Sequence, residues 1–398
     1  MTSKVRSFAC LETAIDSPRT KHSINLETRS IHSRSAEEST RQNLREHENG
    51  NAESWYAEAM KIGLIGGGNI STTHARAASA IPGAEIAAVY GANQNKVSHL
   101  SQQYGAVAYG DLATFMAHRP MDMVIIGSPS GLHAEQGILA ARHGLHVLVE
   151  KPIDVCTESA TALVEACEAA QVKLGVIFQD RFKPQIRRLK LLIEDGILGR
   201  ILLADARVKW YRPPEYYGQS RWRGRWALDG GGALMNQGVH TVDLLLWLLG
   251  DVVRVQARTA TMLHSIETED TALALLEFAC GALGTLQATT AAYPGYARRL
   301  EITGTEGTVI LENDVIIAAD LRKQQADLAI EAMADRSPSA SSPLVSDIRG
   351  HQSAIEDFVH AVEQNRAPAC DGPKALRSVA LIERIYRAAG PVSDEGKS

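Results

Sequence analysis

The sequence predicts an α/β protein of two unlike domains: a parallel sheet covered on both faces by helices, then an α+β domain with an antiparallel or mixed sheet. Three observations support this fold class. Strand and helix patterns alternate between about residues 60 and 180. Strands of period two dominate from about Ile201 onward. A glycine-rich turn joins the first strand to the first helix, and 398 residues are enough for two domains.

The glycine-rich turn lies between Lys61 and His74, in the stretch K-I-G-L-I-G-G-G-N-I-S-T-T-H. Gly66 permits a tight turn, and Gly68 lets the backbone approach a pyrophosphate at the positive N-terminus of the next helix. Ser71, at the third glycine position of G-x-G-x-x-G, is small enough for close helix–strand packing. The turn therefore predicts a Rossmann domain that binds NAD or NADP, with contacts from Gly66, Gly68, Asn69 and Ile70.

The rest of the predicted nucleotide domain, residues 60–180, continues the alternation. The expected strands are Glu85–Tyr90, Asp122–Gly127, His146–Val149 and Lys173–Ile177. The expected helices are Ile70–Ala80, Gln94–Tyr104, Gly131–His143 and Val155–Ala170. A doubly wound sheet holds its ligand at the carboxyl ends of its strands. Further cofactor contacts are therefore expected from Gly91, Asn93, Ser128, Pro129, His133, Glu150 and Lys151.

The end of the second strand bears on the choice of dinucleotide. An acidic residue there would bind the ribose 2′-hydroxyl of NAD. This strand instead ends Tyr90-Gly-Ala-Asn-Gln94, without a carboxylate, and Lys96 follows. A 2′-phosphate would meet no repulsion, but no arginine is placed to clamp it. NADP is therefore slightly favoured over NAD.

Lys151 is the first catalytic candidate. A lone lysine at a strand end is most often an ordinary surface residue. Lys151, however, follows a Val- and Leu-rich strand at the ligand-binding edge of the sheet and precedes Pro152. The pKa of a lysine falls when the side chain is desolvated, so Lys151 can exchange a proton with a substrate hydroxyl or carbonyl.

A second catalytic candidate follows a triple glycine, in the segment Gly230 to Asp243. Helical spacing places Asn236, His240 and Asp243 on one face of an otherwise apolar helix. A single helical histidine more often has a structural role, but a polar trio favours catalysis by His240. Asn236 and Asp243 are expected to contact substrate, although Asp243 has the alternatives of bonding the backbone or orienting the imidazole. No H-x-x-x-H or cysteine cluster is present, and no metal is expected.

Two segments rich in aromatic residues and arginine, 211–217 and 222–226, are the best candidates for substrate contact. Aromatic faces suit sugar rings, and arginines suit hydroxyls or anionic groups. We expect contributions from Tyr217, Arg223 and Trp226.

The second domain is expected to span residues 181–390. Its first helix carries Arg187, Arg188 and Lys190, which are interpreted as a solvated face. Its strands are expected at Ala204–Trp210, Val253–Thr259, Thr271–Phe278, Ala282–Thr290, Arg299–Thr303, Thr308–Leu311 and Val315–Ala318. Residues 335–350 are expected to form a loop, and helices follow over Ile355–Val362 and Leu376–Tyr386.

Composition excludes several classes of protein. A net charge of −5 argues against nucleic-acid binding or a basic membrane-binding surface. No apolar run reaches the ~18 residues of a membrane span. The five cysteines are scattered and resemble reduced thiols, so a cytoplasmic location is expected. Residues 1–59 have the composition of a disordered extension, which suggests that the functional chain starts at Met60, and residues 391–398 form a tail.

From Met60 to Gly390 the chain resembles the Gfo/Idh/MocA family, named for glucose–fructose oxidoreductase and inositol dehydrogenase. The resemblance rests on the glycine turn with His74, on S-P-S-G-L-H at Ser128–His133, and on the Glu150-Lys-Pro triplet. It also rests on G-G-G…H-x-x-D at Gly230–Asp243 and on the pattern E-x-E-D-T at 267–271. The resemblance implies a Rossmann domain followed by an α+β domain with a large, mostly antiparallel open-faced sheet. It also implies a nicotinamide cofactor, a catalytic lysine at Lys151 and a catalytic histidine at His240.

One position departs from the family pattern. Many members have an aspartate four residues before the catalytic histidine, where this chain has Asn236. An amide positions a hydroxyl but takes up no proton, so acid–base chemistry falls on Lys151 and His240. The form M-N-Q-G-V-H is similar to sugar and nucleotide-sugar 3-dehydrogenases of the family.

The leading functional prediction is hydride transfer between NAD(P) and a secondary hydroxyl of a sugar, cyclitol or related polyol. One alternative is a glycosidase or lyase that oxidises the sugar transiently at C3, as some relatives do. Another is a non-catalytic NAD(P)-binding regulator, which retention of both Lys151 and His240 disfavours. A homodimer or homotetramer is expected, because an open sheet must bury its uncovered face or expose a large apolar patch.

Overall fold

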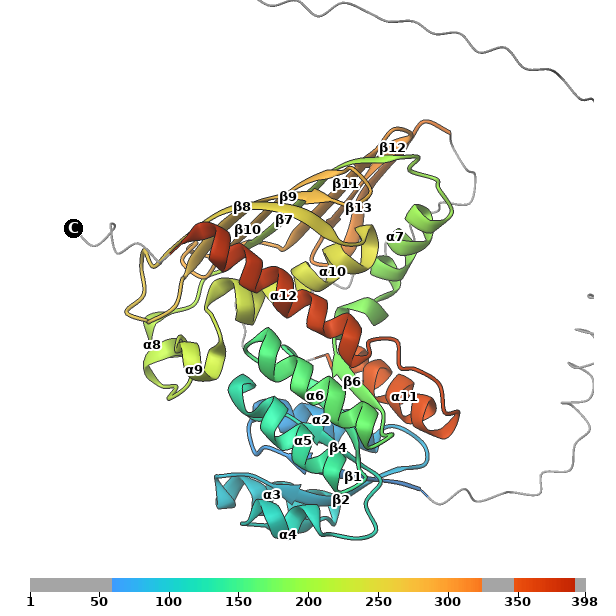
Figure 1. The fold of residues 1–398 in the computed structure, drawn as a ribbon, viewed down its shortest axis with the longest axis vertical. Coiled ribbons are helices and arrows are strands. Elements are labelled where there is room, and N and C mark those ends of the chain that lie inside the picture. Colours follow the sequence, from blue (N-terminus) through green and yellow to red (C-terminus); the bar gives the residue numbers. More distant parts are fainter. Residues whose placement is uncertain (1–58, 324–346, 391–398) are drawn as a thin grey trace, which may run out of the picture. The chain divides into compact units, whose positions relative to one another are not determined.

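The computed structural model describes residues 59–323 and 347–390 (Figure 1). The predicted extension 1–59, apart from Ala59, and the predicted tail 391–398 lie outside the described residues. So does most of the predicted loop 335–350, whose last two residues instead begin a helix. Within the described ranges, no helix is both long enough and apolar enough to cross a bilayer.

The first half is a parallel sheet of six strands in the order β3-β2-β1-β4-β5-β6. This is the strand order of a Rossmann fold, so the predicted fold class is confirmed. The sequence prediction missed only the short elements β3 and α4. The strands are β1 (Met60–Ile65), β2 (Ala84–Tyr90), β3 (Val107–Tyr109), β4 (Met123–Ile126), β5 (His146–Glu150) and β6 (Leu174–Ile177). The helices are α2 (Asn69–Ser79), α3 (Gln94–Tyr104), α4 (Leu112–Met116), α5 (His133–Arg142) and α6 (Thr157–Ala169).

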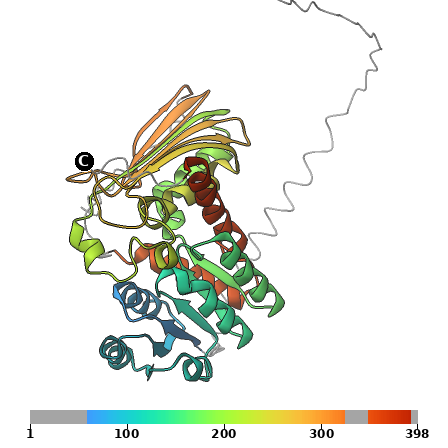
Figure 2. The same ribbon diagram turned by 60° about the vertical axis from the view of Figure 1, so that its left-hand side comes forward.

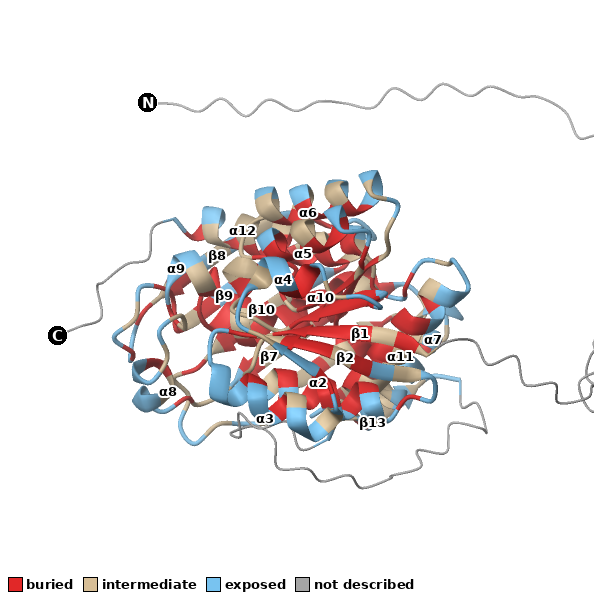
Figure 3. Cartoon of the chain, turned by 90° about the horizontal axis from the view of Figure 1, so that it is seen from below, coloured by how far each residue is buried: buried red, intermediate tan, exposed pale blue. Residues whose placement is uncertain are grey.

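Alternate residues of the central strands face two separate hydrophobic cores, as a sheet covered on both sides requires. In β5, Val147 and Val149 belong to the core that contains Leu163 of α6. Leu148, between them, belongs to the core that contains Phe358 of α11 (Arg349–Glu363). Figure 3 shows α5 and α6 on one side of the buried strand β1 and α2 and α11 on the other.

The second half is a seven-stranded mixed sheet in the order β13-β12-β11-β7-β10-β9-β8, in which only β7 and β10 pair in parallel. Helices α10 (Val239–Leu249) and α12 (Gly372–Ala389) cover one face, and the turned view keeps the helices on that side (Figure 2). The strands are β7 (Ile201–Lys209), β8 (Val252–Ala260), β9 (Thr271–Phe278), β10 (Leu283–Thr289), β11 (Arg299–Gly304), β12 (Gly307–Glu312) and β13 (Val315–Leu321). This arrangement confirms the predicted open-faced sheet.

The predicted boundary at residue 180 does not separate the two halves completely, because helices from the end of the chain pack against the nucleotide half. Helix α11, which follows the second sheet in the chain, packs against α2 and β6 of the nucleotide half. A side-chain carbon added to Gly175 of β6 would lie 2.5 Å from the Phe358 ring, so the absence of a side chain at Gly175 leaves room for that ring. Helix α12 runs from this region to β8 of the second sheet. The remaining short elements are η2 (Gln179–Phe182), α7 (Pro184–Glu194), α8 (Pro214–Gly218) and α9 (Trp226–Asp229).

One predicted helix differs locally. The residues after the triple glycine, Ala233–Gly238, form a π-helical turn named η3, and regular α-helix begins only at Val239. Such wider turns are frequent at functional sites. The glycine loop before this turn is held by the segment that precedes β9: Glu269 accepts hydrogen bonds from Gly232 N at 3.0 Å and Leu234 N at 2.8 Å. Asn236 therefore lies on a turn whose spacing differs from that of an α-helix.

Candidate active site

The glycine turn between β1 and α2 has the geometry that a dinucleotide phosphate needs. Gly66 has a φ of +127°, and a side chain there would lie 2.6 Å from Ser71 Oγ. At Gly68 an added side-chain carbon would meet nothing within 4 Å, so the backbone at the N-terminus of α2 is open to a ligand. No side chain caps that helix end, and the buried Ser71 hydroxyl has no partner among the described residues. These residues fit a pyrophosphate bound at the helix N-terminus.

Asn69 is exposed at the start of α2, and Ile70 packs toward Gly127 at the end of β4. Gly91 ends β2 directly against the glycine turn: an added side-chain carbon would lie 3.0 Å from Gly67 N. Asn93 caps α3 by accepting a hydrogen bond from Lys96 N at 3.2 Å. The predicted residues at these two strand ends therefore border the glycine turn.

Residues at the ends of β4 and β5 are joined by one histidine. The buried His133 ring lies 3.0 Å from the Ser128 carbonyl and 2.8 Å from the Pro152 carbonyl. The Ser128 hydroxyl donates to Gln136 at 2.7 Å, and Pro129 leads into the short turn before α5. His133 thus holds the Ser128 strand end beside the Lys151-Pro152 segment.

Glu150 sits in a buried cluster with two histidines. Its Oε1 lies 2.8 Å from His74 Nε2 and 3.7 Å from His351 Nε2. Burial alone would raise the pKa of Glu150, but the His74 hydrogen bond and the charges of His74, His351 and Lys151 lower it to about 2. The three side chains are near enough to suggest a metal site. Two ligands of one zinc ion lie roughly 3.3 Å apart, however, so the shorter contact is that of a hydrogen bond.

Lys151 lies at the carboxyl end of the sheet, half-buried, with Nζ donating to the main-chain oxygen of Asn236 at 2.9 Å. Burial lowers the pKa of Lys151, the carboxylates of Glu150, Asp229 and Asp180 oppose that shift, and Arg212 adds to it. The hydrogen bond connects the nucleotide sheet to η3 of the second half. Lys151 therefore stands where the two halves meet, with a pKa below that of an exposed lysine.

His240, on the first turn of α10, is only 9% exposed. Burial lowers the pKa of His240 to about 3 against the pull of Asp180, and the charges of Lys151 and Arg298 lower it further. The imidazole is therefore neutral near pH 7. Its Nδ1 is buried without a hydrogen-bond partner among the described residues, and the nearest carboxylate oxygen, Asp180 Oδ2, is 3.9 Å away.

Asp180 is itself held by cations. Arg298 Nη1 lies 2.7 Å from Asp180 Oδ2, and Lys183 Nζ lies 2.8 Å from Oδ1. Burial alone would raise the pKa of Asp180, but Arg298 and Lys183 hold it well below the usual range. The sequence reasoning did not identify this carboxylate as a neighbour of His240.

Asn236 is oriented by a second carboxylate that the sequence reasoning also missed. Its Nδ2 donates to Asp229 Oδ1 at 2.6 Å, while Asp229 Oδ2 accepts from Gly224 N at 2.8 Å. Burial raises the pKa of Asp229 to about 6, although these bonds and the charges of Lys151 and Arg223 lower it. Asp229 directly precedes the triple glycine, and that position was the one signal that could have identified it.

Asp243 does not join His240 and Asn236. Both of its oxygens accept from Arg181, at 2.6 and 2.7 Å, and Ser378 of α12 donates to one of them at 3.3 Å. The carboxylate is 1% exposed, and its partners come from η2 and α12. Asp243 therefore links α10 to η2 and α12. This geometry does not support the predicted substrate contact, nor the alternative in which Asp243 orients the imidazole.

The predicted aromatic contacts separate into packed and accessible residues. Tyr217 is buried, and its hydroxyl is paired with Thr290 Oγ1 at 2.9 Å, so its predicted role as a substrate contact is not supported by this geometry. Trp226 is 39% exposed and donates its indole N–H to the Glu267 carbonyl at 3.0 Å. Arg223 is half-buried over the ring of Tyr216, at 4.2 Å from its centre.

Two family profiles match the chain. Residues 60–178 match the oxidoreductase family with an NAD-binding Rossmann fold, and residues 186–310 match the GFO/IDH/MocA C-terminal domain. Inositol 2-dehydrogenase of Rhizobium meliloti is 26% identical over 336 residues, which cover 83% of this chain and 96% of that protein. Levoglucosan dehydrogenase of Pseudarthrobacter phenanthrenivorans is 27% identical over 289 residues, which cover 63% of this chain and 73% of that protein.

A solved structure is also similar over nearly its whole length. The WlbA dehydrogenase from Bordetella pertussis, in complex with NADH and UDP-GlcNAcA, is 34% identical, with a TM-score of 0.76. The match covers 83% of this chain and 96% of that one. Since both halves match and the glycine turn, Lys151 and His240 lie where the predicted motifs place them, the chain belongs to the Gfo/Idh/MocA family of NAD-binding oxidoreductases.

Proposed function

We propose that this protein is a dehydrogenase that transfers hydride between a nicotinamide dinucleotide and a secondary hydroxyl of a sugar, cyclitol or related polyol. The observation that carries the proposal is the meeting of Lys151 with the η3–α10 segment. The Lys151 amine, bound to the main chain of Asn236, stands at the ligand-binding edge of a sheet with an open glycine turn. Relatives named for sugar and cyclitol dehydrogenation support the substrate class.

The chain's own groups supply proton transfer and positioning. Lys151 donates one N–H to the main-chain carbonyl of Asn236, and burial lowers its pKa, which makes its neutral form easier to reach. In that form its lone pair accepts the proton of a substrate hydroxyl. The neutral His240 imidazole offers a second polar contact for the same oxygen. The Asn236 side chain, with its N–H group bound to Asp229, presents its carbonyl oxygen as an acceptor. Nicotinamide, when bound, supplies the hydride acceptor or donor.

NADP is proposed to be accepted at least as well as NAD. Gly91 presents no carboxylate at the end of β2, and the β-carbon of the exposed Lys96 lies 3.4 Å from the side-chain position of Gly67. An ammonium beside the glycine turn favours a 2′-phosphate. The similar WlbA structure holds NADH, so a direct comparison of NAD with NADP tests this preference.

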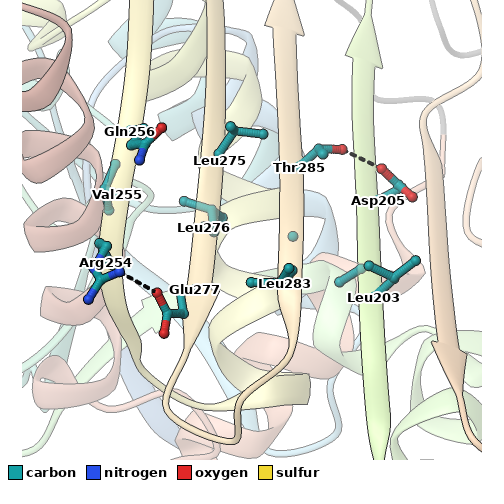
Figure 4. A pocket seen from close by; sticks show the side chains of 12 residues that line it. Leu203, Asp205, Arg254, Val255, Gln256, Leu275, Leu276, Glu277, Leu283 and Thr285 are labelled. Atoms are coloured by element: carbon teal, nitrogen blue, oxygen red, sulfur yellow. Dashed lines mark hydrogen bonds and ion pairs between the residues drawn. The ribbon is translucent and has the colours of Figure 1, made fainter. Parts of the chain in front are cut away.

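The open face of the second sheet supports self-association as a homodimer or homotetramer. Leu203, Leu275 and Leu283 project from it and are 48 to 57% exposed. Figure 4 shows these leucines on three neighbouring strands of the face that also carries the Arg254–Glu277 ion pair, whose partners lie 3.4 Å apart. An apolar face that carries both charges is complementary to a second copy of itself. We propose that another copy covers it.

A cytoplasmic location is proposed on the cysteines. Cys156, Cys167, Cys280 and Cys370 are all unpaired, and two of them are buried. Unpaired thiols are typical of a reducing compartment.

The function is tested by absorbance at the nicotinamide band, with a panel of polyols, sugars, nucleotide sugars and glycosides and with both dinucleotides. Net reduction of NAD or NADP by at least one free or nucleotide-linked sugar is expected. Cleavage of a glycoside without net production of NADH or NADPH would favour the glycosidase or lyase alternative. Tight dinucleotide binding without turnover of any panel member would favour the regulator.

A further inference from the structure

One buried arginine of the second half has no counter-ion. Three arginines, Arg181, Arg212 and Arg298, are less than 9% exposed among the described residues. Arg181 is bound by both oxygens of Asp243, and Arg298 pairs with Asp180 and Asp314. Arg212, at 7% exposure, forms no ion pair within the described part of the chain, and its Nε has no hydrogen-bond partner there. Buried charges are normally paired, so Arg212 lacks an anion that its two counterparts have.

A second arginine lies beside the first. The guanidinium carbons of Arg212 and Arg223 are 5.3 and 4.2 Å from the centre of the same ring, that of Tyr216. The Nε of Arg223 is also buried without a partner among the described residues. Two like charges around one ring repel each other unless an anion lies between them. Gln237, next to Asn236, holds the ring by donating to the Tyr216 hydroxyl at 3.2 Å.

The pair belongs to the same site as the reacting groups. The Tyr216 ring that both guanidinium groups flank is bound by Gln237, and the main-chain oxygen of the adjacent Asn236 accepts the Lys151 amine at 2.9 Å. Consistent with this, the charge of Arg212 lowers the pKa of Lys151, and that of Arg223 lowers the pKa of Asp229. An anion bound by the two arginines would therefore lie on the molecule whose hydroxyl meets Lys151.

We propose that Arg212 and Arg223 form a carboxylate-binding subsite, and that the substrate is an acidic sugar whose carboxylate binds to both guanidinium groups. This inference rests on the proposed function and narrows its substrate class. The planar fork of a guanidinium matches the two oxygens of a carboxylate, and stacking on an aromatic ring holds the fork in place. Sugar phosphates offer oxygens too, so the test separates a carboxylate from a phosphate.

The experiment uses four compounds that vary the two anionic groups independently. UDP-GlcNAcA and UDP-GlcNAc share the diphosphate and differ in the carboxylate, and free GlcNAcA and GlcNAc differ in the carboxylate without the diphosphate. Each is assayed for turnover with the full chain and either dinucleotide, and for affinity by calorimetry on the NADH-loaded protein. The acidic member of each pair is expected to have a kcat/KM or an affinity at least ~10-fold higher.

The variants assign that preference to residues. Arg212→Gln and Arg223→Gln should each raise the KM for the acidic compounds roughly 10- to 100-fold, and change the KM for the neutral compounds less than ~3-fold. Arg221 is an exposed arginine two residues from Arg223, so Arg221→Gln is the control. It should change neither the KM for the acidic compounds nor that for the neutral ones. Thermal melting checks folding, and Arg223→Gln is the more tolerant variant because its side chain is only half-buried.

The outcomes separate this inference from the proposed function. Oxidation of neutral and acidic sugars with equal efficiency would overturn the carboxylate subsite while leaving the dehydrogenase intact. A preference that follows the diphosphate and not the carboxylate would overturn it in favour of phosphate. Acid-selective, Arg212-dependent binding without any turnover would support the subsite and contradict the dehydrogenase. Binding of neither GlcNAcA nor UDP-GlcNAcA would overturn the subsite.

Discussion

Burial sets the direction of the pKa shift for three side chains in this site. It lowers the pKa of Lys151, lowers that of His240 to about 3, and raises that of Asp229 to about 6. A neutral amine and a neutral imidazole are the forms that accept a hydroxyl proton. At neutral pH Asp180, near His240, and Asp229, which is bound to Asn236, carry negative charge.

Asp229 gives a prediction on pH dependence. Its folded pKa of about 6 lies above the ordinary 3.8, so the folded protein binds a proton between these values that the unfolded chain has released. As pH rises from 3.8 to 6, Asp229 therefore makes the folded state less stable, and above 6 this effect is constant. Below pH 6 the protonated carboxyl no longer holds the Asn236 amide, and wild-type kcat/KM should fall there.

The variant Asp229→Asn should lack this inflection and lose about 2- to 10-fold in kcat/KM at pH 8, since one hydrogen bond to the amide changes. The measurement is the pH profile of kcat/KM for both proteins. Glu269, whose pKa burial raises to about 7, also titrates in this range but is unchanged in the variant. An unaltered profile in Asp229→Asn would contradict the role given to Asp229.

At the scale of elements, two glycine loops position the chemistry. The turn before α2 is open at Gly68, and the triple glycine before η3 packs closely on the segment just before β9, where Ala233 N donates to the Glu269 carbonyl at 3.0 Å. A side chain at Gly232 would collide with that Glu269 carbonyl. The first loop leaves room for a ligand, whereas the second leaves room for the protein's own backbone.

This difference yields a matched pair of substitutions. Gly68→Val should abolish dinucleotide binding with little change in melting temperature, because its β-carbon meets no protein atom within 4 Å and the side chain fills the phosphate position. Gly66→Val should lower both the dinucleotide affinity and the melting temperature, because a side chain at a φ of +127° and in contact with Ser71 and Gly127 strains the fold. Fluorescence titration with NADH and thermal melting distinguish them. Normal NADH affinity in Gly68→Val would place the dinucleotide elsewhere.

At the scale of the whole molecule, the C-terminal helices join the two halves. Helix α12 carries Ser378, which contacts Asp243, and Tyr386, which donates to Glu269 at 3.0 Å. The site therefore depends on elements from both halves and from the end of the described chain. The opposite face of the second sheet makes none of these contacts and carries the exposed leucines.

The exposed sheet face predicts the oligomeric state. Leu275→Glu would place a carboxylate in the middle of the apolar face and should convert the dimer or tetramer into a smaller species. Leu191→Glu, at a leucine 52% exposed on α7, is the control and should leave the assembly intact. Light scattering after size-exclusion chromatography measures both. A wild-type monomer would refute the proposed assembly.

The sequence predicted the fold well because its signals were local. Alternating periodicity located the strands from Glu85–Tyr90 to Val315–Ala318, and the glycine turn identified the nucleotide half. It predicted the site less well, because contacts distant in the chain decide it. The bond between Lys151 and Asn236 spans 85 positions, and the pairing of Asp243 with Arg181 spans 62. The sequence pattern also does not distinguish Tyr216 from Tyr217, whereas in the structure Tyr217 is buried and Tyr216 is only half-buried.

The central claim is that Lys151 exchanges the hydroxyl proton at a site where the dinucleotide is held by other residues. Lys151→Ala should lower kcat by about 10²- to 10⁴-fold, the usual contribution of a positioned proton-transfer group. His240→Ala should act similarly but less severely, because Asn236 still positions the substrate. Lys323→Ala, at an exposed lysine beyond β13, is the control.

The decisive measurement is kcat for Lys151→Ala beside its NADH dissociation constant from fluorescence titration. The account predicts a large loss of turnover with nearly unchanged NADH affinity, since the phosphates are bound at the Gly66–Asn69 turn. Near-normal turnover in Lys151→Ala would contradict the mechanism.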